Sequence, residues 1–114
     1  MCDKTVLDEI TSRVCAAAKE VLGDKLEKVI LFGSYARGDY DEESDIDIMI
    51  IADIALEEAN EIRRKIHAQT GDLDLEYDVI VSLRMACSDI FHKCKDVTGF
   101  YINVQKDGVL LYAA

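Results

Sequence analysis

The sequence lacks several features that would each mark a particular class of protein. It has no proline, no low-complexity segment and no internal repeat, so no stretch of it is typical of a linker between domains. It has no CxxC pair and no cysteine with a histidine at ligand spacing, which argues against a zinc site and for reduced thiols. No run approaches the roughly 18 apolar residues of a membrane span, and we find no secretion or lipid-attachment signal. We therefore expect one cytoplasmic domain, residues 1–114, with no membrane contact.

Positive charge is also scarce. Lys and Arg number 13 against 23 Asp and Glu, which leaves a formal net charge of −10. A surface that binds the backbone of a nucleic acid needs clustered cations to displace counterions, so we expect no direct nucleic-acid binding. An anionic ligand would have to be small and neutralised locally, by backbone N–H groups or a metal. A basic protein partner, in contrast, would be attracted.

The hydrophobic pattern predicts an α/β fold, in which helices flank a central mixed sheet. Apolar residues at steps of three and four predict helices over 5–22 and 56–69, the second closed by Gly71. β-Branched runs and alternation predict strands over 28–32, 45–51, 73–81 and 109–112. The segment 82–105 is predicted to form one or two helices broken near Gly99. Cys87 and Cys94 would then share one helix face as packing residues.

Gly33 and Ser34 stand where the first buried strand ends and a short helix should begin. A glycine there lets a ligand approach the backbone, and the free N–H groups of a helix start point at whatever arrives. The serine adds a hydroxyl donor. This pair is suited to holding phosphate without net positive charge.

Asp45 and Asp47 are two residues apart within the second predicted strand. Such residues share a face about 6.6 Å apart, and two carboxylates placed there repel each other and resist burial. A hard divalent cation between them removes this difficulty. Oxygen ligands of this kind, completed by phosphate oxygens, are typical of magnesium in a phosphoryl-transfer site.

The third predicted strand supplies a further carboxylate. Asp78 lies on its polar face and meets the apolar run 79–81, whereas Glu76 lies on the same face one step away. We predict Asp78 as the third member of a carboxylate cluster, with Glu76 as the alternative. Tyr35 and Tyr40 flank the motif and could stack on a base, although packing is the simpler interpretation.

Two other phosphate or metal motifs fail on the same stretch. Gly33 and Gly38 have the spacing of a Walker A loop, but Asp39 and Tyr40 stand where Lys and Ser or Thr are required. An EF-hand that starts at Asp39 lacks both its glycine and its final glutamate.

A family resemblance follows from these residues. The segment Gly33-Ser34-x-Ala36-Arg37-Gly38, followed by Ser44-Asp45-Ile46-Asp47-Ile48, resembles the signature of the DNA polymerase β-like nucleotidyltransferase superfamily. It is most similar to the minimal nucleotidyltransferases, the antitoxins encoded beside HEPN-domain toxins. The resemblance is strongest over 29–51 and extends loosely through 78–81 to the tail. It implies the polymerase β-like nucleotidyltransferase fold over the single domain.

The resemblance also implies roles for individual residues. Asp45 and Asp47 would bind two Mg²⁺ ions, and Asp78 would bind the ion that activates the attacking hydroxyl. Gly33 and Ser34 would hold the phosphates of the nucleotide. Arg37 matches a position that either contacts phosphate or forms an ion pair with the acidic loop at 39–43.

The function implied is magnesium-dependent transfer of NMP from an NTP, expected to be ATP, to a hydroxyl group. In the resembled antitoxins the acceptor is a tyrosine of the HEPN toxin, so a HEPN-domain toxin is the expected partner. One alternative is a non-catalytic antitoxin module that only binds a toxin. Another is a small-molecule, aminoglycoside-type nucleotidyltransferase, whose substrate would need a second wall that a homodimer could supply.

Overall fold

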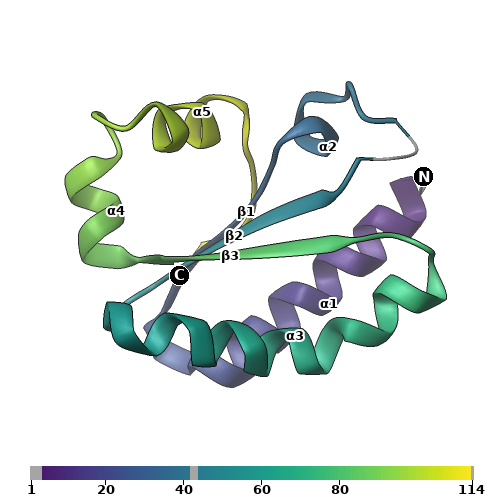
Figure 1. Cartoon of the computed structure of the whole chain (residues 1–114), viewed down its shortest axis with the longest axis horizontal. Helices are drawn as coiled ribbons and strands as arrows, with labels where there is room; N and C mark the ends of the chain where they lie inside the picture. Colours follow the sequence, from purple (N-terminus) through teal and green to yellow (C-terminus); the bar gives the residue numbers. More distant parts are fainter. Residues whose placement is uncertain (1–3, 42–43, 114) are drawn as a thin grey trace.

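The computed structural model describes residues 4–41 and 44–113 and is built on one four-stranded sheet (Figure 1). The strand order is β3-β2-β1-β4, with the bounds β1 (Leu26–Phe32), β2 (Ile46–Ala52), β3 (Val81–Cys87) and β4 (Val109–Ala113). β2 and β3 are parallel, whereas β1 runs antiparallel to both β2 and β4. The predicted mixed sheet flanked by helices is confirmed. Within the described part of the chain, no helix is long and apolar enough to cross a membrane.

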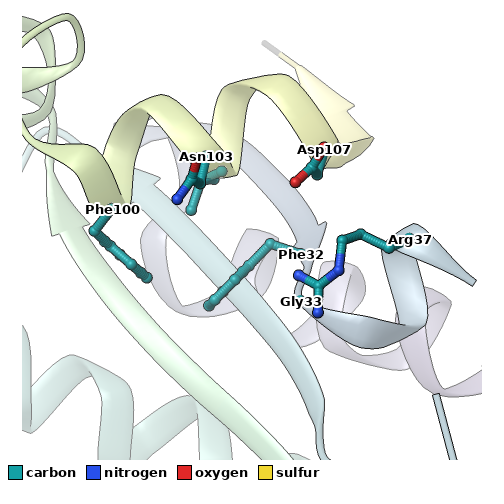
Figure 2. A pocket seen from close by; sticks show the side chains of 7 residues that line it. Phe32, Gly33, Arg37, Phe100, Asn103 and Asp107 are labelled. Atoms are coloured by element: carbon teal, nitrogen blue, oxygen red, sulfur yellow. The ribbon is translucent and has the colours of Figure 1, made fainter. Parts of the chain in front are cut away.

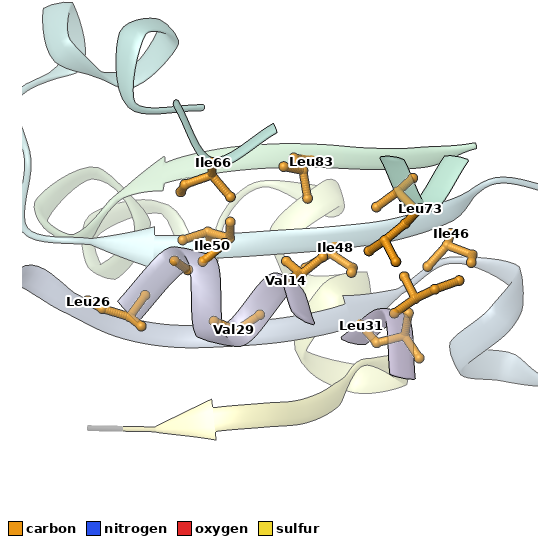
Figure 3. Packing of buried hydrophobic residues seen from close by; sticks show 14 of the residues in the cluster. Val14, Leu26, Val29, Leu31, Ile46, Ile48, Ile50, Ile66, Leu73 and Leu83 are labelled. Carbon is orange, nitrogen blue, oxygen red and sulfur yellow. The ribbon is translucent and has the colours of Figure 1, made fainter. Parts of the chain in front are cut away.

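The two long helices, α1 (Lys4–Leu22) and α3 (Ala59–Glu76), cover one face of the sheet (Figure 1). Short 3-10 turns precede β1 (Gly23–Lys25) and α3 (Leu56–Glu58). Between helices and sheet lies the larger core cluster, seen in Figure 3, to which β2 contributes Ile46, Ile48 and Ile50, all fully buried. Burying such side chains stabilises the fold by about 1.5–3 kcal/mol each before the entropy of ordering is subtracted.

The opposite face of the sheet is covered only in part. α4 (Ser88–Cys94) and α5 (Gly99–Asp107) pack on it around a smaller cluster that includes Met49 and Ile51. Because side chains of a strand alternate between faces, Asp47 points to this same side, one step before Met49. The four-residue helix α2 (Ser34–Arg37) follows β1 at that end of the sheet (Figure 1). The sheet end that bears Asp47 is therefore less covered than the middle, and Asp47 is half-buried.

The predicted strand over 73–81 is wrong, because α3 continues through Glu76. Ile66, Thr70 and Leu73 are all buried on α3, at steps of four and three, so the helical period extends past the predicted end. Leu75, which the alternating pattern placed on the apolar face, is 89% exposed. Gly71 lies inside the helix and does not end it.

The third strand begins at Val81, the last residue of the predicted strand, and continues to Cys87 through a segment that was predicted to be helical. Val81 and Leu83 are buried while Ser82 and Arg84 are exposed, and the segment pairs in register with the whole of β2. Cys87 consequently ends β3 and Cys94 ends α4, so the predicted helix face shared by these two cysteines is also wrong. Cys15, Cys87 and Cys94 are free thiols.

Candidate active site

Gly33 brings the backbone against Asp47. It follows the last residue of β1 and precedes α2, with φ +76° and ψ −156°, a region that only glycine adopts readily. A Cβ built on Gly33 would clash with Oδ2 of Asp47 and lie 3.3 Å from its Cγ. The glycine predicted at this strand end is thus required by both conformation and space.

Asp45 and Asp47 act on each other electrostatically. Asp47 is the second residue of β2, and Asp45 is an exposed residue that directly precedes the strand. Burial raises the pKa of Asp47 above its usual value, and the negative charge of Asp45 raises it further, while the positive charge of Arg37 opposes both. The residues predicted for the centre of the site, Gly33, Asp45, Asp47 and Arg37, therefore lie at one end of the sheet.

Arg37 takes one of its two predicted roles. It is the last residue of α2, and its Nε donates a hydrogen bond to Oδ2 of Asp39 at 3.2 Å. The arginine side chain is 45% exposed in this pair, so the ion pair with the acidic loop contributes little to stability. The positive charge of the same guanidinium partly offsets the rise in the pKa of Asp47.

The structure does not bring Asp78 into a cluster with Asp45 and Asp47. Asp78 lies exposed in the turn between α3 and β3, with φ +51°, and Glu76, the predicted alternative, is the last residue of α3. Over residues 4–41 and 44–113, no three Asp, Glu, His or Cys side chains are grouped as metal ligands. The parallel register pairs Asp47 with Ser82, because β3 begins at Val81, after Asp78, and not at residue 73 as predicted. The role predicted for Asp78 stays a prediction.

The two tyrosines that flank the motif pack against each other. Tyr35 is buried, and its ring stacks on that of Tyr40 at 4.2 Å between centroids and 7° between planes. Both belong to the larger core or contact it. This arrangement agrees with the packing interpretation.

A pocket of about 250 Å³ opens beside Gly33 (Figure 2). Phe32, Gly33 and Arg37 line it from β1 and α2, and α5 lines it from the other side with Phe100, Asn103, Val104 and Asp107. The sequence alone does not connect α5 with the site. The signal was present, because positions 100, 103, 104 and 107 are spaced as one face of a helix, but only the fold places that face opposite Gly33.

The chain is similar to known proteins over most of its length. A family model described as "Nucleotidyltransferase domain" matches residues 13–111. Two proteins of Methanocaldococcus jannaschii, each named "Putative protein adenylyltransferase", are similar over most of their length. MJ0604 is 38% identical over 96 residues, which is 84% of this chain and 88% of that protein. MJ0141 is 42% identical over 91 residues, which is 78% of this chain and 82% of that protein.

Solved structures are similar in fold. A structure described as "Crystal structure of the toxin-antitoxin with AMP-PNP" superposes with a TM-score of 0.61 at 23% identity, covering 91% of this chain and 73% of that one. At this identity the likeness shows the fold alone. The same arrangement of strands and helices therefore occurs in a protein crystallised with a nucleotide analogue.

Proposed function

The chain belongs to the nucleotidyltransferase domain family, and on that basis we propose that it is a magnesium-dependent protein adenylyltransferase. It would move AMP from ATP to a hydroxyl group of a partner protein. The single observation that carries this proposal is the pair of interacting carboxylates, Asp45 and Asp47, of which Asp47 contacts Gly33 at the less covered end of the sheet. The names of the two archaeal relatives support protein as the acceptor.

The carboxylate pair fits a hard divalent cation. Burial and the charge of Asp45 both make ionisation of Asp47 unfavourable, and a cation bound between the two carboxylates would remove that penalty. Asp45 and Asp47 would hold the metal. When bound, Mg²⁺ would lower the pKa of the attacking hydroxyl and neutralise charge on the phosphates. Asp78 is the proposed third ligand, because its turn leads to Val81, which pairs with Ile46 at the same end of the sheet.

The proposed transfer is a single displacement at the α-phosphorus of ATP. The acceptor oxygen forms a bond to the α-phosphorus of ATP while the bond from that phosphorus to the oxygen bridging the β-phosphate breaks. The electron pair of the broken bond leaves with pyrophosphate, and the hydroxyl proton passes to Asp78 or to water. Gly33 and Ser34 would hold the phosphates, and Arg37, which already faces Asp47, would oppose their charge.

The proposed acceptor is a tyrosine of a HEPN-domain toxin. A net charge of −10 favours a basic partner such as a ribonuclease. A toxin as the partner is also supported by the similar fold of the solved structure that is described as a toxin–antitoxin. The site lies at an end of the sheet that the rest of the chain covers only in part. Such a site suits a macromolecular acceptor, because the acceptor itself would cover the open side. We prefer an enzyme to a module that only binds a toxin, because a pure binder has no use for two carboxylates that repel each other.

The test is a labelling experiment. The protein is incubated with Mg²⁺, α-labelled ATP and the toxin encoded by the neighbouring gene, with Tyr→Phe variants of that toxin as controls. Label on the toxin that disappears with one Tyr→Phe change supports the proposal. A tight complex that carries no label supports the binding module, and label on an aminoglycoside in place of the toxin supports the small-molecule enzyme.

A further inference from the structure

The pocket between α5 and the β1–α2 turn has two chemically different sides (Figure 2). On the α2 side it presents the backbone of Gly33 and the guanidinium of Arg37, which suit an anion. On the α5 side it presents a phenyl ring, an amide and a carboxylate, from Phe100, Asn103 and Asp107. The α5 side is unsuited to phosphate, because a carboxylate repels phosphate oxygens.

The aromatic wall of the pocket is held in place. The ring of Phe100 meets that of Phe32 edge to face, with 5.6 Å between centroids and 86° between planes. The guanidinium of Arg84, on the exposed edge strand β3, lies 4.3 Å from the centroid of Phe100. A ring fixed by an aromatic and a cation contact loses little freedom when a flat ligand packs on the same wall.

The polar groups on α5 match the edge of a base and a ribose. The amide of Asn103 offers both a donor and an acceptor, and the carboxylate of Asp107 accepts hydrogen bonds from amino or hydroxyl groups. An asparagine amide pairs well with the amino group and ring nitrogen of adenine. Phe32 and Val104 supply the apolar surface on which a base packs.

We infer that this pocket takes the nucleoside part of the nucleotide, and that Asn103 contributes to the choice of base. The inference rests on the proposed function for the position of the phosphates. At about 250 Å³, the pocket is slightly smaller than the roughly 300 Å³ at which pockets for drug-sized ligands begin, so it suits a nucleoside better than a whole nucleoside triphosphate. Because Gly33 lines the pocket and also contacts Asp47, the phosphate nearest the nucleoside reaches the carboxylate pair.

Arg84 acts in this scheme as a positioning residue. It touches Phe100 and is not among the residues that line the pocket. Replacing it with methionine keeps an unbranched, flexible side chain but removes the guanidinium over the ring. Lysine restores the charge and part of the cation–π contact.

The test separates nucleoside binding from transfer. Binding of adenosine and of ATP is measured by calorimetry for the wild type, Asn103→Ala, Phe100→Leu and Arg84→Met, with Ile102→Ala on the same helix as the matched control. KM and kcat for ATP and GTP are measured in parallel with the toxin acceptor. We expect Asn103→Ala and Phe100→Leu to weaken adenosine binding and raise KM for ATP about tenfold with little change in kcat. Asn103→Ala should also reduce the difference between the KM values for ATP and GTP.

Arg84→Met should raise KM for ATP by a smaller factor, and Arg84→Lys should restore part of the loss. Ile102→Ala should behave as the wild type. Adenosine binding could weaken in the pocket variants while the acceptor is never labelled. That result would support the nucleoside site and overturn the proposed adenylyltransferase activity. Normal transfer with Asn103→Ala and Phe100→Leu indistinguishable from Ile102→Ala would overturn the pocket alone.

Discussion

Gly33 and Asp47 meet so closely that a Cβ at position 33 would clash with Oδ2 of the aspartate, whose side chain would have to move. The contact joins the end of β1 to the beginning of β2, where Phe32 pairs with Asp47 across the antiparallel ladder. One glycine thus sets how near a bound phosphate can come to a carboxylate that would hold metal. The site depends on this approach as well as on the acidic residues.

The first prediction concerns Gly33→Ala. The backbone at Gly33 has φ +76° and ψ −156°, so alanine is expected to destabilise the fold by about 1–3 kcal/mol, and the displaced Asp47 should abolish transfer and weaken ATP binding. Gly23→Ala is the matched control, because Gly23 also has positive φ, +56°, but nothing lies near its Cβ position. Thermal melts should show a loss of stability for both variants. Transfer by Gly33→Ala at the rate of Gly23→Ala would contradict the assignment.

The second prediction concerns the carboxylate pair. Asp45→Asn and Asp47→Asn should each lower transfer by about a hundredfold or more, because each removes a charge that would hold Mg²⁺. Since burial and mutual repulsion raise the pKa of Asp47, its charge opposes folding, and the melting temperature of Asp47→Asn without Mg²⁺ should be equal or higher. Asp53→Asn, an exposed carboxylate just beyond the other end of β2, should change neither property. Unfolding of both site variants would make these residues structural.

The centre of the site could be predicted from the sequence because its residues are close in the chain. Gly33 directly follows one strand, and Asp45 and Asp47 lie where the next strand begins, so local periodicity was enough to place them at the ends of two strands. The antiparallel register of β1 and β2 then brings them together. The pocket was not predictable in this way, because α5 is brought beside Gly33 by tertiary packing, in which Val104 joins Ile30 and Met49 in the smaller core cluster.

The third strand shows where the pattern is ambiguous. Leu73, Leu75 and Tyr77 alternate as in a strand, but Leu73 also continues the helical spacing of Ile66 and Thr70. The segment forms a helix and not a strand because α1 and β3 both pack against α3 and bury the side chains of Ile66, Thr70 and Leu73. Asp74 then closes the turn, since its backbone oxygen accepts from Val79 N at 3.1 Å. Tertiary contacts of this kind are not visible in the local sequence.

The third prediction therefore tests which acidic residue completes the site. We expect Asp78→Asn to lower transfer by about tenfold or more while leaving ATP binding unchanged, because it would act on the hydroxyl and not on the nucleotide. Glu76→Gln, the exposed end of α3, is the matched control and should transfer normally. If Glu76→Gln loses transfer and Asp78→Asn does not, Glu76 is the third carboxylate of the site. Normal transfer by both variants would leave the carboxylate pair as the whole metal site.

The fourth prediction uses a hydrogen-bonded carboxylate on β1 away from the site. Glu27 accepts hydrogen bonds from Oγ of Ser88 at 2.7 Å and from Nε2 of His92 at 2.8 Å, which ties β1 to α4. Burial alone would raise the pKa of Glu27, but the bonds from Ser88 and His92 and the charges of His92 and Lys28 outweigh it and lower the pKa.

A lowered pKa means that Glu27 stabilises the fold above the pKa of the unfolded chain, and that this contribution is lost as the pH falls through the folded value. Glu27→Gln should thus lower the free energy of unfolding by about 1 kcal/mol at neutral pH and by less at about pH 3, where the contribution of the charge declines. Urea titrations at both pH values measure the difference. Glu20→Gln, an exposed glutamate of α1, is the control, and a loss for Glu27→Gln that is the same at both pH values would contradict this account.

The most direct test of nucleotidyl transfer compares two labels on ATP. The protein and its toxin partner are incubated with Mg²⁺ and either α-labelled or γ-labelled ATP, with the Asp47→Asn variant alongside. The account predicts that the α-label enters the toxin, that the γ-label appears only in pyrophosphate, and that both events stop in the variant and after chelation of the metal. Entry of the γ-label into the toxin, or undiminished α-labelling by Asp47→Asn, would contradict it.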